Sequence, residues 1–178
     1  MANYITISRI LLIFPVLMLA SPEPSTANWV ALILFVVAGI TDHLDGYLAR
    51  KTNTTSSLGA LLDLLADKLL IIITLFYFIS FGSDLLLLIP SLIIIIREIV
   101  ITSLRQYLAE KAGGNPLKVT LMAKSKTTIQ IFALSFLIIS PNFGQAFINL
   151  TIFLLWFAAY VSLHSLYDYV KTYINFIK

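Results

Sequence analysis

The sequence predicts an all-α integral membrane protein, a bundle of six transmembrane helices with both termini in the cytoplasm. Composition is the first reason, because 59% of the 178 residues are hydrophobic and only 12% are charged. A soluble domain carries about twice that share of charged residues. The second reason is that the apolar residues fall in runs close to the roughly 20 residues that span a bilayer as a helix. We expect one membrane-embedded domain over residues 1–178.

The first three apolar runs end at polar or helix-breaking segments. We expect helices at residues 5–20, 29–49 and 58–81. Pro22 and Pro24 separate the first run from the second, since proline lacks the amide hydrogen that an internal helical position must donate. A polar segment at 50–57 separates the second run from the third. Gly82 follows the third run, as glycine often does at the end of a helix.

The last three runs are separated in the same way. We expect helices at residues 85–108, 127–140 and 147–169. A long polar segment containing Gly113, Gly114 and Pro116 lies between the fourth run and the fifth, and Pro141 splits the last pair. The fifth run is shorter than a bilayer requires, so hydropathy defines its bounds less well than those of its neighbours.

The distribution of basic residues predicts the orientation of the bundle. The loops after the first, third and fifth runs contain no lysine or arginine. The basic residues of the termini and the other two connections are Arg9, Arg50, Lys51, Lys111, Lys118, Lys124, Lys126, Lys171 and Lys178. Because basic segments stay on the cytoplasmic side, both termini and these connections are expected to face the cytoplasm, across a cytoplasmic (inner) membrane.

Four aspartates stand where the second and third helices should be apolar. They are Asp42, Asp45, Asp63 and Asp67. A charge inside a membrane helix costs roughly 2.5–3.5 kcal/mol at the helix centre, and four like charges also repel one another. Pairing with Lys68 and Arg50 would leave two acids without a partner, so a purely structural role is disfavoured. Carboxylate oxygens suit Mg²⁺, Mn²⁺ or Ca²⁺, and the absence of cysteine excludes thiolate metal sites.

Helical spacing predicts that the four carboxylates converge. The first two aspartates are three residues apart and the last two are four apart, so each pair shares one helix face. A short connection makes the two helices antiparallel neighbours, with the acids near the cytoplasmic surface. Such a group could hold two divalent ions about 3.5–4 Å apart, as phosphoryl-transfer sites do. Gly46 and Gly59 would let a nucleotide or phosphate approach the backbone closely.

The spacing of these residues also resembles a known signature. The pattern Asp42-x2-Asp45-Gly46-x2-Ala49-Arg50-x8-Gly59-x3-Asp63-x3-Asp67 is similar to that of the CDP-alcohol phosphatidyltransferases. The resemblance extends along most of the chain. The further matching segments are Asn3-x-Ile5-Thr6-x2-Arg9 with Pro15, Arg97-Glu98, Ser103-Leu104-Arg105 and Lys124-Ser125-Lys126-Thr127-x2-Gln130. All of these except the N-terminal segment are most like the branch that uses glycerol 3-phosphate.

The resemblance implies an activity and a set of partners. A phosphatidyl group would pass from CDP-diacylglycerol to glycerol 3-phosphate, and CMP would be released by a homodimer that uses Mg²⁺ or Mn²⁺. The same chemistry with inositol phosphate, or with phosphatidylglycerol in cardiolipin synthesis, stays open as an alternative. A divalent-cation transporter is an alternative of another class. It would need acids near the bilayer midplane, with polar residues on both sides of them.

The resemblance also implies a role for each matching residue. The metal ligands would be Asp42, Asp45, Asp63 and Asp67, with Asp67 also acting as the general base. Gly46, Ala49, Arg50 and Gly59 would border the CDP moiety. Since the acceptor carries a phosphate, we assign Arg105, Lys124 and Lys126 to its binding; anchoring of the two lysines to lipid headgroups is the alternative. For Arg97 and Glu98 we expect a buried ion pair that orients the site, because an unpaired buried charge is costly.

Overall fold

The computed structural model describes residues 2–52, 57–82, 84–111 and 121–177, with side chains at 6–41, 62, 65, 66, 68–82, 84–104, 106, 107 and 127–171. This part of the chain is helical and contains no strand. The helices are α1 (Ala2–Leu19), α2 (Ala27–Thr52), α3 (Ser57–Ser80), α4 (Leu85–Lys111), α5 (Leu121–Ile139) and α6 (Gln145–Ile177), with a 3₁₀ turn, η1, at Ser140–Asn142. The expected all-helical class and the six helices are confirmed.

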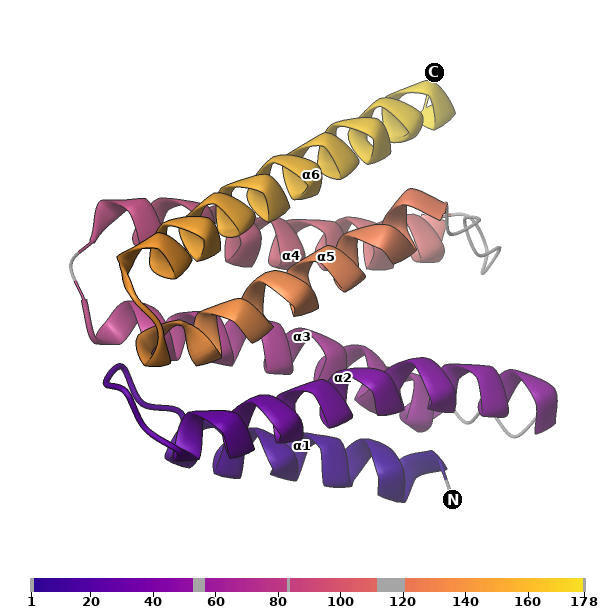
Figure 1. Ribbon diagram of the computed structural model, residues 1–178. Coiled ribbons are helices and arrows are strands. Elements are labelled where there is room, and N and C mark those ends of the chain that lie inside the picture. The colour runs from indigo at the N-terminus through magenta and orange to yellow at the C-terminus, as the bar shows by residue number, and fades with distance from the viewer. Residues whose placement is uncertain (1, 53–56, 83, 112–120, 178) are drawn as a thin grey trace.

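The helices form an up-and-down bundle (Figure 1). α1 packs against both α2 and α3, while α4 and α5 both pack against α6. Contacts of α2 with α5 and of α3 with α4 join these two groups. The start of α1 and the end of α6 lie at one end of the bundle, which we call the terminal end. The connections α1–α2, α3–α4 and α5–α6 lie at the opposite end, which we call the loop end.

Two helices extend six residues or more beyond the bounds that hydropathy indicates. α5 begins at Leu121, where we expected residue 127, and α6 continues to Ile177, where we expected residue 169. Both extensions contain lysine, which has a high helix propensity and can keep its charged end in a polar layer. A helix is held by its backbone hydrogen bonds, so it need not stop where the apolar run stops.

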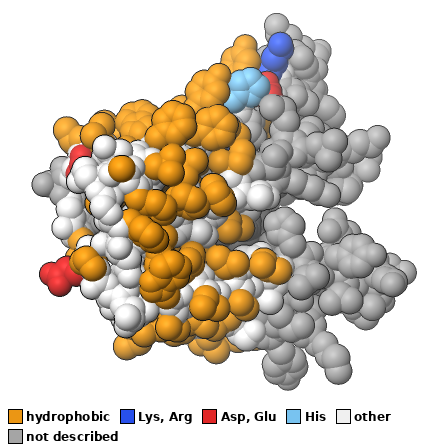
Figure 2. Space-filling model, viewed as in Figure 1, with side chains coloured by type: hydrophobic (Ala, Val, Ile, Leu, Met, Phe, Trp, Pro, Cys, Tyr) orange, Lys and Arg blue, Asp and Glu red, His pale blue; other side chains and the backbone are white. Residues whose placement is uncertain are grey.

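The surface of the bundle is unusually apolar. Figure 2 shows hydrophobic side chains spread over the helices in a broad band, with charged side chains toward its margins. Met18, Ile33, Phe76 and Phe153, from four helices, have exposed fractions between 60% and 87%. Leu85–Leu104 and Gln145–Lys171 are each long and apolar enough to cross a membrane. Extended exposed apolar surface of this kind indicates contact with lipid.

A cluster of polar side chains closes the loop end. The buried Asn28 amide donates to Asn142 Oδ1 at 2.7 Å and to the carbonyl of Glu23 at 3.1 Å, while its oxygen accepts from the Ser21 amide at 2.7 Å. Asn142 Nδ2 in turn donates to the carbonyl of Ser25 at 2.7 Å. These bonds join the α1–α2 connection to η1, so two segments far apart in the sequence are fixed together.

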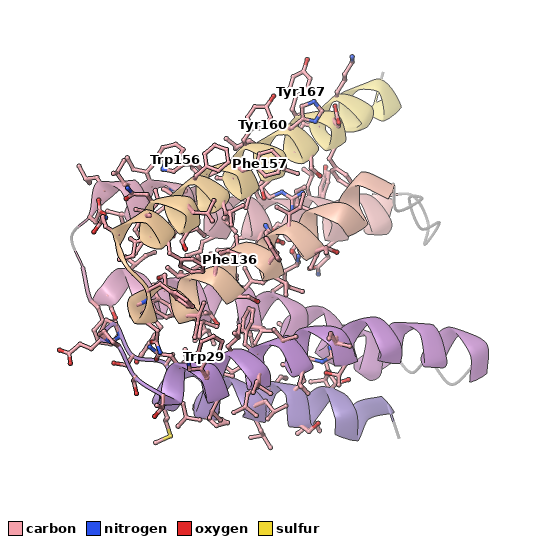
Figure 3. All side chains as sticks on the ribbon, in the orientation of Figure 1. Trp29, Phe136, Trp156, Phe157, Tyr160 and Tyr167 are labelled. Carbon is pink, nitrogen blue, oxygen red and sulfur yellow. The ribbon has the colours of Figure 1, made fainter. Side chains whose placement is uncertain are left out.

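Aromatic rings continue this closure between α2, α5 and α6. Trp29 lies edge-on to Phe143 with ring centroids 6.1 Å apart, and Phe143 stacks on Phe147 at 4.4 Å. Phe147 stacks in turn on Phe136 at 5.1 Å (Trp29 and Phe136 are labelled in Figure 3). Each such pair stabilises the fold by about 0.5–1.5 kcal/mol in addition to the stabilisation from the apolar area that it buries. The loop end is therefore packed by both polar and aromatic contacts.

We predict that Asn28→Ala lowers the free energy of unfolding by about 1–3 kcal/mol, because the three hydrogen bonds of this buried amide to partners at the loop end are lost. Thermal unfolding of the detergent-purified protein measures this change. The matched control is Asn149→Ala, which removes an exposed amide that accepts a hydrogen bond from Gln145 of the same helix. The control should stay within about 0.5 kcal/mol of the wild type. Equal losses in both variants would contradict a clamp at Asn28.

Candidate active site

The four aspartates lie on neighbouring helices toward the terminal end. Asp42 and Asp45 are in the C-terminal half of α2, and Asp63 and Asp67 are in the N-terminal half of α3. α2 and α3 run antiparallel and contact each other, as their short connection predicts. The four side chains lie outside the described part of the structure. Convergence of their carboxylates therefore stays a prediction, now made from two helices that are seen to be adjacent.

The other expected site residues also lie on helix segments at the terminal end. They are Gly46, Ala49 and Arg50 on α2, Gly59 on α3, Arg105 on α4, and Lys124 and Lys126 on α5. The early start of α5 places both lysines in its first two turns. The side chains of this group are also outside the described part. Their contacts with a CDP moiety or an acceptor phosphate stay predictions.

α1 brings a buried cation to the helices that carry the aspartates. Arg9 and Thr6 are 1% and 3% exposed, and α1 packs against α2 and α3. Arg9 was expected to flank the first helix at the membrane surface, but the structure buries it inside the bundle. Because a guanidinium stays charged in proteins, Arg9 places positive charge among three helices whose four acidic residues are the aspartates.

A buried ion pair lies on α4, next to α3. Glu98 is 0% exposed and Arg97 is 3% exposed, and Arg97 Nη1 donates to Glu98 Oε1 at 2.9 Å. Glu98 Oε2 also pairs with Nζ of Lys68, the residue that follows Asp67 on α3. The expected buried pair between Arg97 and Glu98 is confirmed. One carboxylate thus joins two cations from neighbouring helices.

Hydrogen bonds extend this ion pair to α5 and α6. Gln130 Nε2 donates to Glu98 Oε1 at 3.1 Å and to Ser162 Oγ at 3.0 Å. Arg97 Nε donates to the carbonyl of Ser162 at 3.0 Å, and its Nη2 donates to Ser165 Oγ at 2.8 Å. Together with Lys68, these residues form what we call the polar hub. Four helices meet in it, and removing one partner of a buried ion pair of this kind costs about 3–5 kcal/mol.

Gly39 is a residue that the sequence reasoning missed. A Cβ atom placed on this buried glycine would lie 3.2 Å from Cδ1 of Ile131 on α5. The absence of a side chain therefore lets α2 approach α5 closely, one turn before Asp42. The signal was present in the pair Ala38-Gly39, because small residues mark close helix contacts in membranes.

Four polar residues of α6, namely Tyr160, His164, Tyr167 and Asp168, lie at the outer surface of the bundle. Figure 3 shows Tyr160 and Tyr167 pointing outward from α6. His164 Nδ1 lies 3.3 Å from Asp168 Oδ2, and both of these side chains are about half exposed. These residues line no interior site. Their aromatic rings at the outer surface fit an interfacial belt.

The donor set fits hard divalent cations. Among the residues with described side chains, no group of three or more histidine, cysteine, aspartate or glutamate residues could hold a metal ion. The aspartates of α2 and α3 remain the candidate ligands. Carboxylates alone, without cysteine anywhere in the chain, match the preference of Mg²⁺ and Mn²⁺ for oxygen.

Comparison with known proteins shows the family of this chain. A profile of the CDP-alcohol phosphatidyltransferases matches residues 1–163. Because the match covers most of the chain, the protein belongs to the CDP-alcohol phosphatidyltransferase family. All eight positions of the signature quoted above lie inside the matched region.

Several relatives share the name CDP-diacylglycerol–glycerol-3-phosphate 3-phosphatidyltransferase. The protein of Rickettsia typhi is 39% identical over 173 residues, which cover 95% of this chain and 94% of the relative. The protein of Haemophilus influenzae is 35% identical over 169 residues, covering 94% and 90%. The protein of Wigglesworthia glossinidia brevipalpis is 46% identical over 110 residues, covering 62% of this chain and 60% of the relative.

We predict that Gly39→Leu destabilises the protein by about 1–3 kcal/mol, because the larger side chain forces α2 and α5 apart. Gly39→Ala is the matched control. It needs a shift of only a few tenths of an ångström at the flexible end of Ile131, and alanine favours the helix by up to about 1 kcal/mol over glycine. Thermal unfolding in detergent should separate the two variants clearly. A stable leucine variant would show that α2 and α5 need no close approach.

Proposed function

We propose that the protein transfers the phosphatidyl group of CDP-diacylglycerol to glycerol 3-phosphate, forming phosphatidylglycerophosphate and CMP. The activity is thus that of a phosphatidylglycerophosphate synthase in phospholipid biosynthesis. The observation that carries the proposal is the 39% identity to the Rickettsia typhi relative over nearly the whole of both chains. The complete eight-position signature on two adjacent helices supports the same chemistry.

In this reaction a hydroxyl oxygen of the acceptor attacks the phosphorus that carries the diacylglycerol group, and CMP leaves. Asp67 accepts the proton of that hydroxyl as general base, which is a role open to a carboxylate beside the acceptor. Arg50 presents a planar fork of donors to the diphosphate oxygens. Gly46, Ala49 and Gly59 leave room beside the helices for the CDP moiety.

Two divalent ions, Mg²⁺ or Mn²⁺, would be held by Asp42, Asp45, Asp63 and Asp67. When bound, they would supply positive charge to the diphosphate and to the leaving CMP. The chain's own contribution is to hold four acids on the adjacent α2 and α3, with the buried Arg9 on α1 beside both helices. This cation reduces the mutual repulsion of the carboxylates before metal binds.

The acceptor phosphate is bound by Arg105 on α4 with Lys124 and Lys126 on α5. Three cations from two helices at the terminal end favour a phosphorylated acceptor over serine. They discriminate poorly between glycerol 3-phosphate and inositol phosphate, and the names of the relatives favour the first. Inositol phosphate, or phosphatidylglycerol in cardiolipin synthesis, is the alternative acceptor.

We further propose that all six helices span a cytoplasmic (inner) membrane, with both termini and the active site on the cytoplasmic side. The apolar outer surface of the bundle and the basic residues at its terminal end support this orientation. Lipid substrate then enters from the leaflet beside α2 and α3. The working form is a homodimer, as family membership suggests.

A divalent-cation transporter is the rival of a different class. Transport needs a polar path through the whole bundle, whereas the loop end is closed by the Asn28–Asn142 clamp and by stacked rings. The aspartates lie at the other end, so the site is a dead end. That arrangement suits an enzyme that draws lipid from one leaflet.

The first test is CMP release from CDP-diacylglycerol by the detergent-purified protein with Mg²⁺ or Mn²⁺. We predict release with glycerol 3-phosphate and none with inositol phosphate, serine or phosphatidylglycerol. EDTA should abolish the release, because it removes the metals whose positive charge would stabilise CMP as it leaves. Release with another acceptor would overturn the acceptor assignment. No release from folded protein would overturn the enzyme assignment.

The matched control for this assay is Asp67→Asn, which keeps the shape of the side chain but removes the proposed base. It should abolish turnover while binding of CDP-diacylglycerol largely persists. Substantial residual activity would show that Asp67 is not the base.

We predict that Lys126→Ala raises the KM for glycerol 3-phosphate by at least about tenfold, the factor that corresponds to one charge-assisted hydrogen bond. The KM for CDP-diacylglycerol should stay within about twofold of the wild type. Initial rates of CMP release, with each substrate varied in turn, give both constants. Equal changes in the two constants would indicate that Lys126 anchors the protein to lipid headgroups.

A further inference from the structure

The polar hub joins the helix of the proposed base to the helices of the proposed acceptor pocket. Glu98 is its centre, because its two carboxylate oxygens receive Lys68 from α3, Arg97 from α4 and Gln130 from α5. Glu98 has no exposure to solvent. Whatever moves this carboxylate therefore moves contacts on three helices at once.

The α3, α4 and α5 arms of the hub each lead to a residue with an assigned role. Lys68 directly follows Asp67 on α3. Gln130 lies four residues after Lys126, on the same face of α5 and about 6 Å deeper. Glu98 lies seven residues before Arg105, on the same face of α4 and about 10 Å deeper. The hub therefore adjoins the proposed base on α3, and on α4 and α5 it lies deeper in the bundle than the acceptor-phosphate residues.

We propose that Glu98 is a positioning residue for the acceptor, because it sets the separation between Asp67 and the phosphate-binding residues of α4 and α5. The proposal rests on the proposed function. When the acceptor is bound through its phosphate, its hydroxyl reaches the base only if that separation matches the length of the acceptor. An error of about 1 Å in such a placement can cost about 100-fold in rate.

The hub also has an arm that does not lead to the site. Arg97 Nη2 donates to Ser165 Oγ on α6, to which none of the catalytic or binding roles is assigned. Ser165→Ala therefore removes a hydrogen bond from the same network without touching the α3 or α5 arm. It is a matched control for a purely structural contribution.

The experiment compares Glu98→Gln, Gln130→Met and Ser165→Ala with the wild-type protein in detergent. Unfolding midpoints are measured first, and kcat and both KM values are then measured well below the lowest midpoint. Gln130→Met is the variant most certain to fold. It keeps the side-chain volume, and it removes an amide oxygen that has no hydrogen-bond partner among the described residues. It cuts the arm from Glu98 to α5 and the hydrogen bond from Gln130 to Ser162 of α6, and it leaves the Lys68 and Arg97 contacts of Glu98 in place.

We expect Glu98→Gln to lower kcat/KM for glycerol 3-phosphate by about 100-fold. Gln130→Met should raise the KM for glycerol 3-phosphate about tenfold. In both variants the KM for CDP-diacylglycerol should stay within about twofold, and Ser165→Ala should change only the unfolding midpoint. If Glu98→Gln does not fold, Gln130→Met alone decides.

Three results would overturn the proposal. If Glu98→Gln and Gln130→Met keep the wild-type kcat and KM values but have lower unfolding midpoints, the hub only stabilises the fold. An equal rise in both KM values would show that the hub does not act on the acceptor in particular. Absence of CMP release from folded wild-type protein would overturn the proposed function, and the positioning role with it.

Discussion

The charge of Glu98 constrains much of the bundle. A carboxylate with no exposure to solvent must be paired, and Lys68, Arg97 and Gln130 each come to it from a different helix. Unlike apolar contacts, which tolerate sliding, ion pairs and hydrogen bonds require particular distances and directions. The relative rotation of α3, α4 and α5 is therefore set where these groups meet. That rotation also fixes the directions in which α3 presents the proposed metal ligands and α4 and α5 present the basic residues.

The two ends of the bundle differ in chemistry, and the difference suits an enzyme in a membrane. The loop end has neutral amides and stacked rings that hold neighbouring connections together. The helix segments at the terminal end carry the aspartates and most of the basic residues, and on α4 and α5 the polar hub lies about 6–10 Å deeper. The outer surface between the two ends is apolar.

Much of the fold and of the candidate site could be predicted before any coordinates. The six helices follow from apolar runs and from proline and glycine breaks, because both signals are local. The signature on α2 and α3 is local as well, since helical spacing alone puts its aspartates on shared faces. The start of α5 and the end of α6 were harder to predict, because turns that contain lysine can be helical without being apolar. Gly39 was missed because its role is to let α2 approach Ile131 of α5 closely, and Ile131 is remote in sequence.

The sequence by itself determined the class of chemistry, because four aspartates and two glycines at fixed spacing need no tertiary contact to be recognised. It also indicated that Arg97 and Glu98 would pair, since adjacent buried charges have few alternatives. Only the tertiary structure decided that Lys68, Gln130, Ser162 and Ser165 complete that pair. It also decided that Arg9 is buried rather than interfacial. The physical reason is that the partner of a buried charge is chosen by helix packing, which brings together residues that no sequence interval relates.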